Sequence, residues 1–81
     1  SRDLWASMMG MVKRMEFLKM SGDPDGDFAM IMKRHCQGVI DMAQMQLKSG
    51  SDSKMRAMAT RIIEAEQKEM KEFDRWLEKR N

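Results

Sequence analysis

Three kinds of side chain that bind soft metal ions occur together in one short segment. The only histidine and the only cysteine of the chain are neighbours, His35 and Cys36. Four methionines lie within ten residues of this pair, namely Met30, Met32, Met42 and Met45. Imidazole, thiolate and thioether groups suit soft transition metals such as copper. The segment therefore predicts a metal site, with Cu(I) as the first ion to test.

Helical spacing selects the favoured ligands within this segment. Met32 and His35 are three residues apart, and Met42 lies two turns after His35, so all three share one helix face. Cys36 is 100° further around the helix and is the additional candidate. The alternative is that the methionines fill an irregular core around a hydrogen-bonded histidine. Cys36 would then be a buried apolar residue, or a cross-link between chains if exposed.

A second set of methionines lies near the start of the chain. Met8, Met11 and Met15 are spaced by three and four residues, which places them on one helix face. They suit a second soft-metal site, or else simple core packing. Methionine accounts for 12 of the 81 residues, an unusual share for a residue that specifies packing poorly.

Other kinds of chemistry are less well supported by the sequence. Asp23, Asp25 and Asp27 alternate as in a calcium-binding loop, but the glycine and the final glutamate of that motif are absent. Glu66 and Glu69 suggest a di-iron centre, which would need more histidines than one chain offers. No nucleophile has a base at a usable spacing. We therefore do not expect an enzyme.

The composition of the chain limits the classes of binding partner that we expect. The net charge is only +2 although 35% of the residues are charged, and no basic cluster of the kind that binds nucleic acid is visible. No apolar stretch approaches the length of a membrane span. A single cysteine cannot form an internal disulfide.

The elements that must position these residues are helices. Good helix formers dominate, and only two segments break the pattern. In residues 21–24, Gly22 suits a helix end, Asp23 an N-cap and Pro24 the first helical position. In residues 49–52, glycine again suits a terminator and serine a cap. We expect one all-α domain over residues 1–81, with helices at about 3–20, 24–48 and 52–80, forming an antiparallel up-down bundle that dimerisation would complete.

Periodicity predicts which side chains face inward. In the second helix the expected inward stripe is Phe28, Met32, His35, Val39, Met42 and Gln46. In the third it is Met55, Ala59, Ile62, Glu66, Glu69, Phe73 and Trp76. Because antiparallel helices place their middles side by side, we expect the His35 imidazole to meet one of the two carboxylates.

Several of these segments, taken together, resemble the domain-of-unknown-function family 305. The similar parts are an Asp-x-Asp-Phe opening at residues 25–28, the segment from Met32 through His35 to Met42, Ile62-Ile63 followed by Glu69, and Trp76-Leu77. The resemblance covers about residues 21–77. It implies a ferritin-like helical bundle, a periplasmic or membrane-anchored location in a bacterium, and, in some members, copper binding.

Two departures from the family pattern affect the expected site. The family has a second histidine where this chain has Cys36, and a glutamine where it has Glu66. A thiolate in place of imidazole would favour Cu(I) further. We expect copper sequestration or tolerance rather than catalysis. The competing hypothesis is a metal-free helical module that binds another helix or a second copy of the chain.

Overall fold

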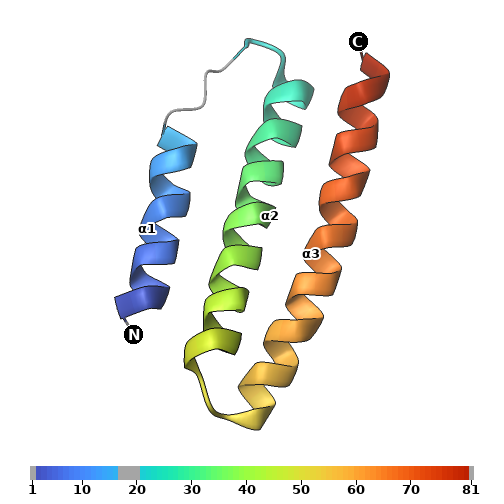
Figure 1. The fold of residues 1–81 in the computed structure, drawn as a ribbon. Coiled ribbons are helices and arrows are strands. Elements are labelled where there is room, and N and C mark those ends of the chain that lie inside the picture. The colour runs from blue at the N-terminus through green and yellow to red at the C-terminus, as the bar shows by residue number, and fades with distance from the viewer. Residues whose placement is uncertain (1, 17–20, 81) are drawn as a thin grey trace.

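The computed structural model describes residues 2–16 and 21–80, without the side chains of residues 14–16. Its elements are α1 (Arg2–Glu16), α2 (Pro24–Ser49) and α3 (Ser53–Arg80), with no strand among the described residues. The predicted all-α, up-down arrangement is confirmed (Figure 1). Of the expected first helix, residues 17–20 lie outside the described residues. Among the described helices, none is both long and apolar enough to cross a membrane.

The three helices form a single open layer rather than a closed triangle. In Figure 1, α2 lies between α1 and α3, and no described Cα atom of α1 is within 8 Å of one of α3. The structure extends 43 × 23 × 13 Å. Neighbouring helix axes are about 8–10 Å apart, so 23 Å is the width of three helices side by side. One face of the layer can therefore be apolar without having another of the described elements over it.

Burial is concentrated on the two flanks of α2. Its buried residues are Ala29, Cys36, Gly38, Ile40 and Ala43, and Ala59 is the buried residue of α3. The small side chains at these positions let the helices approach closely. None of the six residues of the expected inward stripe on α2 is buried, so that prediction is wrong. The stripe faces away from both neighbours because α2 has one helix on each side, and its two flanks are buried against these helices.

The connection between α1 and α2 is held by a polar turn. Gly22 has a φ of 86°, the left-handed conformation expected of it. The Asp27 carboxylate accepts hydrogen bonds from the Ser21 backbone N–H at 3.0 Å and from the Ser21 hydroxyl at 2.8 Å. The Ser21 N–H is the main reason that the pKa of Asp27 lies below its ordinary value. Asp23 occupies the predicted N-cap position, but its side chain forms an ion pair with Arg80 instead of capping the helix.

The connection between α2 and α3 uses a different cap from the one expected. Gly50 ends α2, and its N–H donates to the Gln46 carbonyl at 2.7 Å. The Asp52 carboxylate accepts a hydrogen bond from the Met55 N–H at 2.9 Å and so caps α3, where a serine was predicted to do so. The tight turn sets α3 antiparallel to α2 and fixes which residues of the two helices face each other.

Candidate functional site

A cluster of potential metal ligands lies in the middle of the interface between α2 and α3. The Cys36 side chain is fully buried, and it faces Glu66 and Glu69. One donor atom from each residue lies within 4.8 Å of the other two. No other group of three His, Cys, Asp or Glu side chains is this compact among the residues that the structure describes.

The local sequence explains why these side chains meet. Cys36 occupies the same flank of α2 as Ala29, Ile40 and Ala43, and this flank is buried against α3. Glu66 and Glu69 are three residues apart, so one face of α3 presents both carboxylates to the same region. The small residues of α2 leave room for the longer glutamates. The thiol is thus held at the interface while the carboxylates reach it from the opposite helix.

The electrostatics of the cluster keep the thiol protonated. Burial, followed by the hydrogen bond to Glu66 and the negative charges of Glu66 and Glu69, raises the pKa of Cys36 to about 12. The thiol is therefore a hydrogen-bond donor to Glu66 at neutral pH. The Glu66 Oε2 atom is nevertheless buried without a hydrogen-bond donor among the described residues. Such an atom costs free energy unless a further positive or hydrogen-bonding group reaches it.

A metal cation would satisfy all three groups. It would replace the thiol proton, and a divalent ion would offset two of the three negative charges of the thiolate and the carboxylates while giving Glu66 Oε2 a partner. Donor atoms around a tetrahedral Zn²⁺ ion lie about 3.5 Å apart, given bond lengths of about 2.0–2.3 Å. A spread of up to 4.8 Å requires only a small inward movement of the two glutamates. A set of three protein ligands would leave a coordination position open for water or another ligand.

The predicted ligands on α2 are divided between two directions. Met32, His35 and Met42 are half-buried, and helical spacing places them on the open face of α2. Met42 lines a groove on that face, together with Val39. Among the described residues, the His35 side chain makes no hydrogen bond or ion pair and does not belong to the ligand cluster. The glutamates expected to meet His35 meet its neighbour Cys36 instead.

The N-terminal methionines of the second predicted set also differ in their surroundings. Met11 packs against Gly38 so closely that a Cβ atom at Gly38 would overlap the Met11 side chain. Met8 is half-buried, and the side chain of Met15 lies outside the described residues. The contact with Gly38 makes Met11 part of the packing between α1 and α2. This contact does not test whether Met8, Met11 and Met15 bind a metal.

The sequence contained a signal for the cluster on the flank of the expected inward stripe of α2. Cys36, Ile40 and Ala43 are spaced by four and three residues, which is the spacing of a helix face in its own right. This face is the one buried against α3, so the thiol was the residue to pair with Glu66 and Glu69. We expected His35 to meet a carboxylate because a buried imidazole needs a partner, but His35 is only half-buried.

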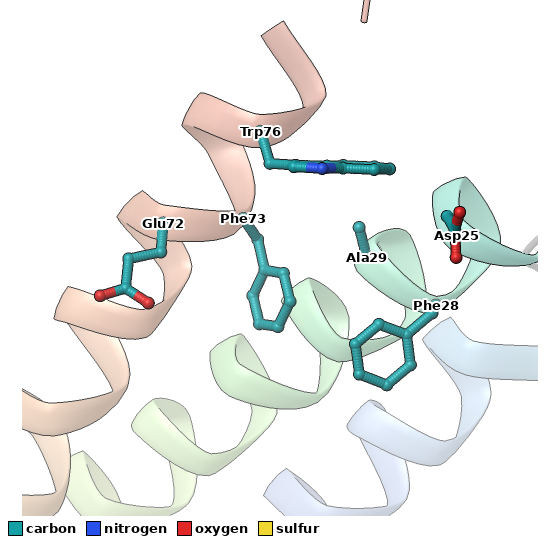
Figure 2. A pocket seen from close by; sticks show the side chains of 6 residues that line it. All are labelled: Asp25, Phe28, Ala29, Glu72, Phe73 and Trp76. Atoms are coloured by element: carbon teal, nitrogen blue, oxygen red, sulfur yellow. The ribbon is translucent and has the colours of Figure 1, made fainter. Parts of the chain in front are cut away.

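An aromatic pocket lies at the other end of the same interface, where α2 begins and α3 ends. Figure 2 shows Phe28 from α2 and Phe73 and Trp76 from α3 around one hollow. The two phenylalanine rings meet edge to face, with centroids 6.1 Å apart. The Arg80 guanidinium lies over the Trp76 ring, 4.5 Å from its centroid. Because Phe28 is 60% exposed, these contacts leave much of the aromatic surface uncovered.

Comparison with known proteins supports the resemblance noted in the sequence. The profile of the family described as "Domain of unknown function (DUF305)" matches residues 3–79. A search among curated proteins gave no match, and a search among solved structures gave none either. The family match includes all three helices, the Cys36 cluster and the methionines of the first helix. The chain therefore belongs to the DUF305 family.

Proposed function

We propose that this protein binds a metal ion at Cys36, Glu66 and Glu69 and serves in metal handling rather than in catalysis. The observation that carries the proposal is the interhelical cluster, in which the buried Cys36 thiol and two carboxylates lie within 4.8 Å of one another. The buried and unpartnered Oε2 atom of Glu66 supports it, because a bound cation would remove that cost.

The ligand types point to a borderline divalent ion such as Zn²⁺ at this cluster. Zinc accepts both thiolate and carboxylate ligands in tetrahedral sites. Cu(I) prefers sulfur and imidazole, so two carboxylates suit it poorly. This ion class replaces copper for the interhelical cluster, while Cys36 keeps its proposed role as a ligand.

Cu(I) remains our second candidate, at a separate set of ligands. Met32, His35 and Met42 share the open face of α2, all three are half-buried, and the His35 imidazole is unengaged among the described residues. A thioether and imidazole set of this kind suits Cu(I). The two candidates use different faces of α2, so they can be tested separately.

Cobalt spectroscopy tests the first proposal directly. Titration of the chelator-treated protein with Co²⁺ should produce a thiolate-to-metal charge-transfer band in the near ultraviolet, and Zn²⁺ should remove it. Cys36→Ser should lose the band, and Glu66→Gln should weaken binding about tenfold or more, because loss of a group that only orients a ligand already costs that much. His35→Ala is the matched control, because it alters the adjacent residue and should leave the band unchanged. A wild-type protein that gives no band would overturn the cluster as a metal site.

Competition for Cu(I) tests the second proposal, the copper site on the open face. Wild-type protein and the Cys36→Ser variant should both withdraw Cu(I) from a chromogenic chelator, whereas His35→Ala should lose most of this ability. Equal competition by His35→Ala and wild type would remove His35 from any copper site. Loss of competition in Cys36→Ser alone would instead assign copper to the interhelical cluster.

A further inference from the structure

The open face of the helical layer carries large apolar side chains toward both of its ends, with the half-buried His35 near its middle. A groove of about 260 Å³ crosses all three helices on this face, and its larger apolar lining residues are Leu4, Val39, Met42, Met55, Met58 and Ile62. Helical spacing extends the same face along α2 to Phe28 and along α3 to Trp76. The other face differs, since its two grooves are lined by side chains such as Asp41, Gln44 and Lys71.

The accessible surface of the whole chain is large for its size. The accessible surface is 6048 Å² for 9.5 kDa, whereas a compact monomer of that mass exposes about 5,000 Å². The radius of gyration is 14.3 Å, against about 11.7 Å for a compact domain of the same length. The excess surface is about 1,000 Å², which is close to the roughly 800 Å² that each partner buries in a stable dimer. The area fits a second copy of the chain.

The two ends of the open face are complementary to each other. One end carries the aromatic side chains Phe28 and Trp76, which are 60% and 40% exposed. The other end carries the groove with Met42, Met55 and Met58. Aromatic rings pack favourably against thioether sulfur. A surface with an aromatic end and a methionine-lined end can pair with itself if the second copy runs in the opposite direction.

The residue spacing places the centre of such a pairing at one point. On α2, Phe28 lies eight residues before Cys36, and Met42 and Gln46 lie six and ten residues after it. On α3, Trp76 lies ten residues after Glu66, and Met58 and Met55 lie eight and eleven residues before it. Cys36 and Glu66 face each other in the structure. Both midpoints therefore coincide, and a two-fold axis perpendicular to the helices can pass over this pair.

We propose that the open face binds the open face of a second copy to form an antiparallel homodimer. Phe28 and Trp76 of each copy cover the methionine groove of the other. The polar face of each layer stays in solvent, so the assembly closes at two copies. The proposal does not depend on a metal, and it is tested in the presence of a strong chelator.

Sedimentation equilibrium tests the dimer, with a matched pair of variants. Met58 and Met30 are each 37% exposed, but Met58 lines the groove. Met30 belongs to the helix strip of Gln37 and Gln44 on the polar face. Met58→Asp should weaken dimerisation at least about tenfold, because a carboxylate would be buried in an apolar interface, while Met30→Asp should not change it. A monomeric wild type, or equal effects of the two variants, would overturn the proposal.

Cross-linking tests the orientation without altering the anchor residues. Arg61 and Glu72 are exposed and eleven residues apart, which places them on one strip of α3. In the antiparallel register, residue 61 of one copy lies beside residue 72 of the other. A mixture of Arg61→Cys and Glu72→Cys proteins should be joined by a short bismaleimide. Each variant alone should not be, because like positions lie about 15–18 Å apart at 1.5 Å per residue.

Controls make either result interpretable. Wild-type protein should remain unlinked, since the Cys36 thiol is fully buried. Circular dichroism should show that each variant keeps its helices. Cross-linking of Glu72→Cys to itself, or of no pair at all, would overturn the antiparallel arrangement.

Discussion

The Cys36 thiol lies against the Glu66 carboxylate across the interface between α2 and α3, at the midpoint of both helices. This pairing combines a fully buried thiol with an acid that has a buried and unpartnered oxygen atom. The metal-free protein therefore has a polar site where its core should be most apolar. That cost is the physical reason to expect both an unusual pH dependence and an affinity for cations.

Stability of the metal-free protein should fall in alkaline solution because of Cys36. Below pH 9.0, the ordinary pKa of a thiol, Cys36 is protonated in both the folded and the unfolded state. Above it, the unfolded chain loses the proton, while burial and the two glutamates hold the folded thiol protonated up to about pH 12. The unfolded state then binds fewer protons, so the free energy of unfolding decreases by at most about 1.4 kcal/mol per pH unit.

Cys36→Ala isolates this contribution from the lysines, which titrate in the same range. Urea unfolding in chelator at several pH values between 8 and 11 should show that any stability advantage of the wild type over Cys36→Ala shrinks as the pH rises. A constant difference between the two proteins would contradict the raised pKa of Cys36.

Metal binding at the cluster should release one proton from Cys36. Because the pKa of the thiol is about 12, the ion must displace a proton at every pH near neutrality. The dissociation constant for Zn²⁺ should thus fall about tenfold per pH unit between pH 6 and 8. Calorimetry in buffers with different ionisation enthalpies measures the proton release. Cys36→Ser should lose the release, whereas His35→Ala should retain it.

Periodicity identified the apolar stripes correctly, but it did not predict which face of each helix packs against its neighbours. On α2, the strongest stripe includes Phe28, Val39 and Met42, and in a closed bundle it would face the core. Here α2 has a neighbour on each side, so its narrower flanks of alanine, cysteine and isoleucine are buried. No single-helix pattern distinguishes these two arrangements, because the difference lies in where the other helices pack. The cluster of Cys36 with Glu66 could therefore be placed only once the layer was known.

The turns were more predictable, since their residues act locally. Gly22 takes the left-handed conformation that its type favours, and Pro24 opens α2. Cap chemistry was less certain, because serine and aspartate both suit an N-cap and both occur at residues 51–52. Asp23 shows why the partner of a capping side chain is hard to predict, since its carboxylate forms an ion pair with Arg80 at the far end of α3. A partner this distant in the sequence cannot be read from the turn itself.

Removal of the Asp52 cap should destabilise the protein by about 1 kcal/mol. In Asp52→Ala, the Met55 N–H loses the acceptor that now lies 2.9 Å away. Asp52→Asn is the matched control, because its amide oxygen can still accept the hydrogen bond and it should remain near wild type. Urea unfolding should show a lower midpoint with an unchanged slope for the alanine variant. Equal midpoints for Asp52→Ala and Asp52→Asn would show that the cap contributes little.

Gly38→Ala should loosen the packing of α1 on α2. Alanine in place of glycine in a helix normally stabilises it by about 1 kcal/mol. At Gly38, however, the new Cβ atom would overlap the Met11 side chain, including its Cβ atom at 2.7 Å, which cannot rotate away. The strain of such overpacking is about 1–3 kcal/mol, so the net change should be a loss of stability.

Hydrogen exchange locates this effect. Amides of α1 should lose protection in Gly38→Ala, while those of α3 keep theirs, because α3 packs on the opposite flank of α2. Met11→Ala should restore part of the loss, since it removes the overlapping sulfur but leaves the Cβ atom. Gly26→Ala is the control, because its new Cβ atom would meet the Asp23 carboxylate and the Arg80 guanidinium rather than a side chain of α1. Unchanged protection of α1 in Gly38→Ala would contradict a close Met11–Gly38 contact, and with it the placement of α1 beside α2.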